Sequence, residues 1–371
     1  MKQAHLLPLP LRQVDRTYVL SGGRKLIYFA GCDYFRLSSH PAIIRALQKG
    51  VKSTGISVSA SRKTTGNHPF FDELERALAR FFKSPAAVLI GTGYMTNLVV
   101  AQALAGRFTH ALIDQRAHPS LQDAAAFLGC AVISFRHQDP AHVAQILSRL
   151  GRGAVPLLLT DGVFAHDGSI APIGEYLKTL PAKGIILLDD AHAAGVLGKN
   201  GRGTVEQLKL SPERIIRTVT LSKAFGVYGG AILCDESIRE LVLTRSRMFT
   251  GHTPMPLPLA QAALASVRLL ERDHALRQRL VKNTGVVKSE LRKAGLQLPE
   301  TPAPIIGYVP KAGDEVAKLR ATLLKAGIHP PLIDYPGGPE HGYFRFVLSS
   351  EHTMPQITKL VHSIKSALAI R

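Results

Sequence analysis

Short apolar or β-branched runs alternate with amphipathic stretches along most of the chain. The runs predict strands, and their nearly continuous apolar character is typical of strands buried on both faces. The clearest predicted strands are 86–90, 131–135, 156–160, 185–188 and 218–220. Apolar residues at helical spacing predict helices between the strands, at 69–82, 95–105 and 141–150. Strands that alternate with helices predict an α/β fold with a largely parallel sheet.

The two ends of the chain show weaker patterns. Residues 6–20 have no periodicity and are expected to form an extended arm, followed by a strand at 25–30. Ser38-Ser39-His40-Pro41 predicts a helix start with a serine cap, and Gly50 is expected to end that helix. Beyond 258 the pattern predicts a long helix at 259–294, strands at 305–309 and 343–348, and helices at 314–326 and 354–369.

These patterns divide the chain into three predicted parts. We expect an N-terminal arm and strand over 1–45 and a large domain over 46–255. A linker helix with a small C-terminal domain is expected over 256–371. A chain of 371 residues is long enough for this organisation.

The composition excludes several classes of protein. Apolar residues make up 46% of the chain, which is ordinary for a globular enzyme. No apolar run approaches the roughly 20 residues that span a bilayer, and the N-terminus lacks a signal-peptide pattern. Cys32, Cys130 and Cys234 lie far apart without metal-ligand spacing, so we expect reduced thiols, no metal site and a cytoplasmic protein.

Two predicted strands end in side chains that carry chemistry. The segment 185–198, IILLDDAHAAGVLG, ends its strand in Asp189 and Asp190, with His192 close behind. The segment 217–230, RTVTLSKAFGVYGG, places Lys223 in a glycine-rich turn after a strand. Burial disfavours an ammonium group and leaves an amine that can form an imine. An ordinary strand-end lysine is the alternative for Lys223 alone, but the two segments together predict a pyridoxal phosphate (PLP) site. The lysine would bind the PLP aldehyde and the aspartate its ring nitrogen.

The same segments, DDAHAAGVLGKNGRG and TLSKAFG, resemble those of the α-oxoamine synthases, and the resemblance runs from about residue 28 to the C-terminus. It implies the PLP-dependent transferase fold of type I, with a large domain, a small α+β C-terminal domain and a homodimer with shared sites. The implied reaction is the decarboxylative condensation of a small amino acid with an acyl thioester to give an α-amino ketone.

The resemblance also assigns roles to individual residues. Lys223 would carry PLP as an imine, Asp189 would pair with the ring nitrogen, and His118 would stack on the ring as a catalytic residue. His192 would bond the phenolic oxygen, and Arg345 the substrate carboxylate. The remaining cofactor-binding residues would be Gly93, Tyr94, Thr220 and Ser222, with Thr250 and Thr253 reaching the partner subunit's phosphate. Independently of the family, glycines at the strand-to-helix turn 91–94 favour a phosphate.

Three positions depart from the family pattern. Cys32 stands where the family has asparagine, Phe71 where it has histidine, and Ala165 where a serine lies near the phenolic oxygen. These changes leave two alternatives to the condensation open: an aminotransferase or other PLP enzyme of the same fold, and a non-catalytic PLP-binding protein. Retention of Lys223 and Asp189 argues against the second.

The charge points to anionic partners. Lysine and arginine number 46 against 27 acidic residues, a formal net charge of +19. Such a surface attracts polyanions, and the expected acyl donors, acyl-CoA or an acyl carrier protein thioester, are both anionic. The basic residues are scattered without a tract of five or more, so a nucleic-acid partner is not expected, and a merely basic surface is the alternative.

Overall fold

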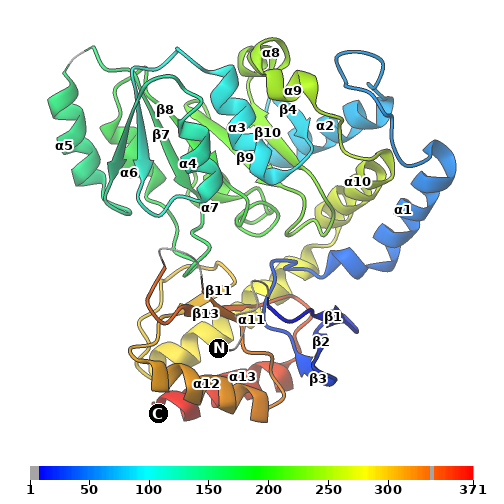
Figure 1. Cartoon of the computed structure of the whole chain (residues 1–371), viewed down its shortest axis with the longest axis vertical. Helices are drawn as coiled ribbons and strands as arrows, with labels where there is room; N and C mark the ends of the chain where they lie inside the picture. Colours follow the sequence, from blue (N-terminus) through cyan, green and yellow to red (C-terminus); the bar gives the residue numbers. More distant parts are fainter. Residues whose placement is uncertain (1–7, 152, 335–337, 371) are drawn as a thin grey trace, which may run out of the picture. The chain divides into compact units, whose positions relative to one another are not determined.

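The computed structural model describes residues 8–151, 153–334 and 338–370. The chain forms two compact units (Figure 1). The large unit consists of Leu37–Ala165 and Ser169–Arg277, and the small unit of residues up to Arg36, His166–Gly168 and residues from Gln278 onward. The predicted division into domains at 45 and 255 stays a prediction.

The large unit is built on a seven-stranded sheet with the order β4-β10-β9-β8-β7-β5-β6 (Figure 1). β10 is antiparallel to both of its neighbours, and the pairs from β9 to β6 are parallel. This mixed, mostly parallel sheet confirms the predicted α/β class. The strands are β4 (Ala86–Ile90), β5 (His110–Asp114), β6 (Ala131–Phe135), β7 (Pro156–Asp161), β8 (Ile185–Asp189), β9 (Ile215–Thr220) and β10 (Gly230–Cys234).

Apolar side chains cover both faces of this sheet. Leu157 and Leu159 point into one buried cluster and Leu158 into another, because successive side chains of a strand alternate. Burying each leucine contributes about 1.5–3 kcal/mol relative to exposure. The first cluster is completed by α3 (Gly93–Ala103), α4 (Pro119–Ala125), α8 (Glu236–Arg245) and α9 (Arg247–Gly251). The second is completed by α5 (Pro140–Leu150), α6 (Ile173–Thr179) and α7 (Thr204–Gln207).

The first long helix corrects two predictions. After the short 3-10 helix η1 (Leu37–Ser39), α1 (Pro41–Thr54) is capped by His40, whose Nδ1 accepts the N–H of Ala42 at 3.2 Å, and not by a serine. Gly50 lies inside α1 rather than at its end. A Cβ at Gly50 would meet the Cα of Pro258 at 2.7 Å, so the glycine permits close packing of α1 on α10 (Leu257–Arg272). α2 (Pro69–Phe82) has its predicted limits and also packs on α10.

The predicted helix over 259–294 is wrong, because two helices occupy this stretch. α10 ends at Arg272 and α11 (His274–Lys293) begins two residues later. Asp273 separates them with a non-helical ψ of 85°. Its carboxylate accepts the N–H of Ala275 at 3.0 Å, and a side chain that bonds nearby backbone in this way competes with helix continuation.

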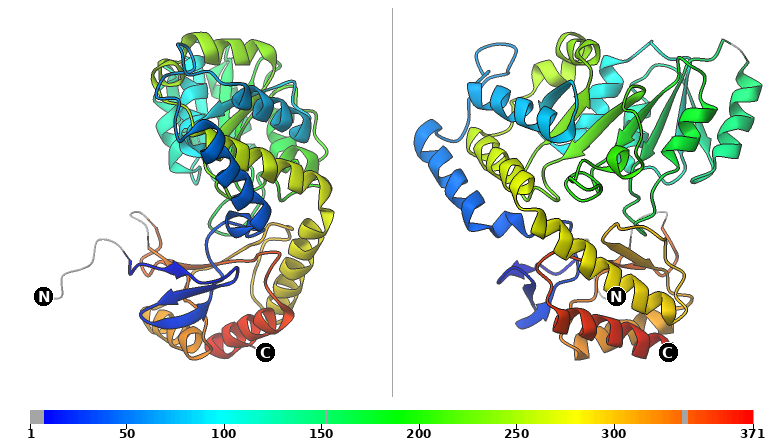
Figure 2. Two further views of the ribbon diagram at one scale, coloured as in Figure 1. Left: turned by 90° about the vertical axis from the view of Figure 1, so that its right-hand side faces the viewer. Right: turned by 180° about the vertical axis from the view of Figure 1, so that it is seen from behind.

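The small unit contains two antiparallel three-stranded sheets, β1-β2-β3 and β11-β13-β12, while α12 and α13 pack against each other (Figure 2). The elements are β1 (Arg12–Gln13), β2 (Tyr18–Ser21), β3 (Arg24–Ile27), β11 (Ile305–Tyr308), α12 (Gly313–Lys325), β12 (Leu332–Ile333), β13 (Tyr343–Val347) and α13 (Met354–Leu368). β1 and the start of β2 lie in the stretch 6–20, which was predicted to be an extended arm and of which residues 6 and 7 lie outside the described residues. Among the described residues, no helix is both long and apolar enough to cross a membrane.

Candidate active site

A cavity of about 180 Å³ lies in the large unit, where β7, β8 and β9 end and α3 and α4 begin. Carboxyl ends of parallel strands commonly form such sites. The cavity brings together eight of the residues predicted from the sequence: Gly93, Tyr94, His118, Asp189, His192, Thr220, Ser222 and Lys223. The other lining residues, which were not predicted, are Thr92, Ser120, Asp161, Ala191, Tyr228 and Gly229.

Lys223 lies in the turn that connects β9 to β10. The turn closes through the N–H of Gly226, which donates to the carbonyl of Lys223 at 2.9 Å. Gly226 has a φ of +64°, and a Cβ there would meet the backbone N of Ser38 at 2.4 Å, so only glycine fits. Lys223 is partly exposed rather than fully buried, which corrects the degree of burial expected from its setting. Its amine therefore lines an open cavity.

Hydrogen-bond donors converge at the N-terminus of α3. Thr92 caps the helix, with its Oγ1 accepting the N–H of Met95 at 3.2 Å. A Cβ at Gly93 would meet Thr220 Oγ1 at 2.6 Å, so the glycine lets the helix start lie directly against the end of β9. Thr220 Oγ1 is 2.8 Å from Ser222 Oγ. Free helix N–H groups with nearby hydroxyls form an anion site that suits a phosphate.

Asp189 and Asp190 have different surroundings. Asp189 lines the cavity; its Oδ1 accepts the N–H of Ala191 at 3.0 Å and its Oδ2 accepts Nδ2 of Asn97 at 2.7 Å. Asp190 is fully buried and does not line the cavity; its Oδ1 accepts the hydroxyl of Thr204 at 2.5 Å. Burial raises the pKa of Asp190 to about 6, although Thr204 and Arg217 oppose the increase. The geometry leaves Asp189 to face a ligand and gives Asp190 a structural role.

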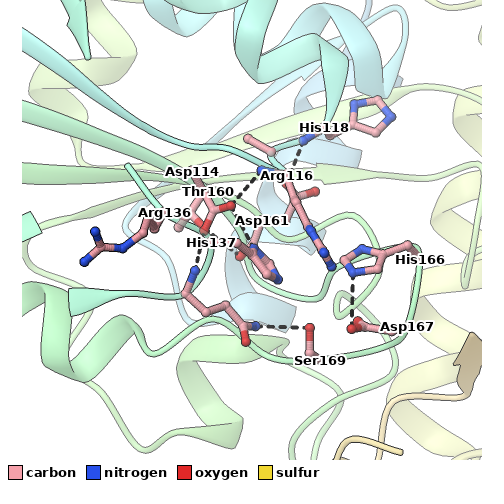
Figure 3. A network of polar contacts seen from close by, with 12 residues as sticks. Asp114, Arg116, His118, Arg136, His137, Thr160, Asp161, His166, Asp167 and Ser169 are labelled. Atoms are coloured by element: carbon pink, nitrogen blue, oxygen red, sulfur yellow. Dashed lines mark hydrogen bonds and ion pairs between the residues drawn. The ribbon is translucent and has the colours of Figure 1, made fainter. Parts of the chain in front are cut away.

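Asp161 and His118 form a linked pair (Figure 3). Asp161 is the register partner of Asp189 in the parallel pair of β7 and β8, and its Oδ2 accepts the backbone N–H of His118 at 2.8 Å. Burial, and then the charge of Asp189, raise the pKa of Asp161 well above its usual range. Burial lowers the pKa of His118, and the ammonium of Lys223 acts in the same direction. Burial therefore disfavours the charged forms of both Asp161 and His118.

A second polar cluster lies at the end of β5 (Figure 3). The buried Asp114 accepts Nδ1 of His137 at 2.8 Å, the N–H of Arg116 at 2.8 Å and the N–H of Gln138 at 3.0 Å. These bonds fix the segment after β6 against the segment that leads to His118. Asp114 is thus a support of the loop and does not line the cavity.

Three predicted site residues lie outside the cavity lining. Thr250 donates its hydroxyl to the carbonyl of Ser246 at 3.1 Å within α9, and Thr253 is exposed. Both were predicted to reach the site of a partner subunit, so their role stays a prediction. Arg345 is a partly buried residue in the middle of β13, in the small unit, and its role in carboxylate binding also stays a prediction.

The departures from the family pattern have separate structural settings. Phe71 is fully buried, and the guanidinium of Arg62 lies 5.2 Å from its ring centroid, so it serves packing. Ala165 and Cys32 are partly exposed. His166, the residue after Ala165, has its Nε2 3.2 Å from Oδ2 of Asp167.

The lining residues that were not predicted differ in how clearly the sequence marks them. Thr92 directly precedes Gly93, Ser120 lies two positions after His118, and Tyr228 lies two positions after the end of the TLSKAFG segment, so all three were close to predicted motifs. Asp161 ends an apolar run as Asp189 does, and the same argument applies to it. Asn97 lies behind the lining, with no local pattern that marks it.

These groups fit the parts of PLP. The donors at the start of α3 fit its phosphate, and the carboxylate of Asp189 fits a protonated ring nitrogen. The amine of Lys223 fits its aldehyde. Among the described residues, no cluster of histidine, cysteine and carboxylate side chains could hold a metal ion.

Comparisons with known proteins agree with this fit. The family model described as aminotransferase class I and II matches residues 24–364. An 8-amino-7-oxononanoate synthase of Thioalkalivibrio sulfidiphilus is 35% identical over 349 residues, covering 93% of this chain and 89% of that protein. One from Acidithiobacillus ferrooxidans is 34% identical over 366 residues, covering 98% and 93%.

Solved structures show the same relationship. Serine palmitoyltransferase from S. paucimobilis with bound PLP and myriocin superposes with a TM-score of 0.90 at 26% identity, covering 97% of this chain and 92% of that one. The 8-amino-7-oxononanoate synthase from Francisella tularensis gives a TM-score of 0.80 at 26% identity, covering 93% and 98%.

Proposed function

The chain belongs to the aminotransferase class I and II family, and we propose that it condenses an amino acid with an acyl thioester in the manner of 8-amino-7-oxononanoate synthase. The observation that carries the proposal is the meeting of Lys223, Asp189 and His118 in one cavity at neighbouring strand ends. Biotin biosynthesis is the pathway that this product name implies. The homodimer, the cytoplasmic location and the nature of the acyl carrier remain predictions.

Several predictions from the sequence are confirmed by the relatives. The α-oxoamine synthase resemblance, the fold-type I architecture, the enzymatic nature of the protein and the PLP cofactor all agree with the matched proteins. The α-oxoamine synthase reaction is likewise supported.

The residues of the cavity divide the chemical work. When bound, PLP supplies an electron sink for the carbanion at the amino-acid α-carbon. Asp189 would hold the proton on the ring nitrogen by its negative charge, and the donors at the start of α3 would bind the phosphate. Lys223 would hold the aldehyde carbon and then move the proton at the substrate α-carbon. His118 would lie against the ring, and His192, which is 4% exposed, would donate to the phenolic oxygen.

The product name fixes the substrates of the proposed reaction. The product is a nine-carbon acid with its amino group at C8 and its oxo group at C7, and the condensation forms its C7–C8 bond. The C8–C9 part is alanine without its carboxyl group, and the rest is a seven-carbon dicarboxylic acyl group. The new C–C bond forms as the thioester C–S bond and the alanine Cα–carboxyl bond break. The reaction releases one CO2 and one thiol for each amino ketone.

A screen of products tests this proposal. Amino acids would be incubated in turn with acyl-CoA and acyl carrier protein thioesters, and the products identified by mass spectrometry. We expect an α-amino ketone from alanine and a dicarboxylic thioester. Because one structural neighbour is a serine palmitoyltransferase, serine with a long-chain thioester is the second substrate pair to compare with alanine and the dicarboxylic thioester. A 2-oxo acid formed without thioester consumption would indicate an aminotransferase instead.

We expect a salt-dependent reaction with the acyl donor. A net charge of +19 is larger than the PLP chemistry of the cavity requires. Electrostatic attraction of an anionic donor weakens as salt is added, because at 0.15 M ionic strength interactions between exposed charges more than roughly 8 Å apart are largely screened. Raising the ionic strength should therefore lower kcat/KM for the donor steeply and leave kcat/KM for the zwitterionic amino acid nearly unchanged. An acyl carrier protein should show the steeper dependence, because its charges cover a wider surface. A flat donor profile would assign the charge to another role.

A further inference from the structure

Asn97 is a fully buried residue of α3 whose amide lies between two groups of the proposed active site. Its Nδ2 donates to Asp189 Oδ2 at 2.7 Å and to Ser120 Oγ at 2.9 Å. Its Oδ1 accepts the hydroxyl of Thr218 at 2.6 Å. Both amide hydrogens and the amide oxygen are therefore engaged, and the opposite orientation would set the oxygen against the Asp189 carboxylate.

The first consequence concerns Asp189. Its carboxylate receives one donor on each oxygen, from Ala191 on Oδ1 and from Asn97 on Oδ2. Donors aimed at a buried carboxylate stabilise its negative charge and fix its orientation. Asn97 thus supports the charge that the proposed function requires beside the ring nitrogen.

The second consequence concerns His118, through Ser120. Because Ser120 Oγ accepts a hydrogen from Asn97, its own hydroxyl hydrogen is free to point at His118 Nδ1, 2.8 Å away. The same Nδ1 accepts the N–H of Ser120 at 3.2 Å. Nδ1 is therefore an acceptor, and the proton of the neutral imidazole resides on Nε2.

We propose that Asn97 is a positioning residue that sets the Asp189 carboxylate and the His118 tautomer together through its single amide group. The inference rests on the proposed function for the roles of Asp189 and His118 toward PLP. Partners that orient metal ligands from behind typically change activity by roughly 10–100-fold, and by analogy we expect an effect of that order here.

Asn97→Asp tests this role because it keeps the size and the acceptor for Thr218 but sets a second carboxyl group against Asp189. Two carboxyl groups this close share one proton, so the negative charge beside the ring nitrogen is no longer held by Asp189 alone. In the PLP-loaded variant, the visible absorption band of the cofactor should change with pH at a midpoint that differs from that of the native protein by about one pH unit or more. The α-proton exchange of alanine, measured in deuterated water without thioester, should fall by roughly 10–100-fold. Ser120→Ala breaks only the branch to His118, so it should change the pH profile of exchange and leave the visible transition near that of the native protein.

Asn283→Ala is the matched control. Asn283 is a buried asparagine of the small unit whose Nδ2 donates to the carbonyls of Ser349 at 3.0 Å and His352 at 2.9 Å. Its replacement should lower Tm without displacing the visible transition. The proposal is overturned if folded Asn97→Asp keeps the native transition and an exchange rate within about twofold of native.

A second pair of variants covers the case in which Asn97→Asp does not fold. Thr218→Val then frees the amide to rotate, and native spectra and exchange in both Thr218→Val and Ser120→Ala would overturn the proposal. Neither readout uses the thioester. A protein that shows the displaced transition but no condensation would therefore contradict the proposed function and leave the role of Asn97 standing.

Discussion

Replacement of Lys223 with alanine is expected to abolish the covalent attachment of PLP. The native protein should be yellow, with a visible band that borohydride removes, and Lys223→Ala should lack that reducible band. Turnover should fall by several orders of magnitude, because the residue both binds the cofactor and moves a proton. The measurement is a visible spectrum before and after borohydride, followed by mass spectrometry of the labelled peptide.

Lys178→Ala provides the control for this expectation. Lys178 has a side chain that is 74% exposed and pairs with Glu175 at 2.8 Å, and it does not line the cavity. That variant should keep the native band and activity. If a reducible band persisted in Lys223→Ala, PLP would be attached to another amine, and Lys223 would not be the central residue of the proposed site.

We expect Asp189→Asn and Asp190→Asn to have different effects, because only the first of these adjacent carboxylates faces the cavity. Asp189→Asn should still bind PLP but lose almost all α-proton exchange, because a carboxylate beside a protonated ring nitrogen is worth several kcal/mol to the developing carbanion, by analogy with other site charges. Asp190→Asn should keep the exchange and lower Tm, since Asp190 holds Thr204 and lies outside the cavity lining. Normal exchange in the first variant with none in the second would reverse the assignment.

The sequence predicted the central part of the site because of one geometric rule. Lys223, Asp189 and His192 each lie at or just after the end of a predicted strand, and ends of neighbouring parallel strands meet at one edge of the sheet. A pattern that is local in sequence therefore carries three-dimensional information. Asp161 lies in the same way at the end of β7, although it was not among the predicted residues.

Asn97 was not predictable in this way. It lies inside α3, where a polar residue between apolar neighbours looks the same whether it faces water or a carboxylate. Its contacts with Asp189 and Thr218 join residues 92 and 121 positions apart in sequence. Only the packing of α3 on the sheet brings these groups together.

The two wrong helix limits had different causes. Gly50 and Asp273 are both residues that commonly end helices, but Gly50 continues α1 because the adjacent Pro258 leaves no room for a side chain. Asp273 breaks a strongly helical stretch by bonding the N–H of Ala275. Packing against α10 decided the outcome at Gly50, and a local side-chain bond decided it at Asp273.

The fate of the amino-acid carboxyl carbon tests the central claim most directly. Alanine labelled at its carboxyl carbon would be incubated with the PLP-loaded protein and the seven-carbon dicarboxylic acyl thioester. The proposed condensation predicts labelled CO2, free thiol and unlabelled α-amino ketone in equal amounts. A 2-oxo acid that retains the label, formed while the thioester remains intact, would contradict the condensation.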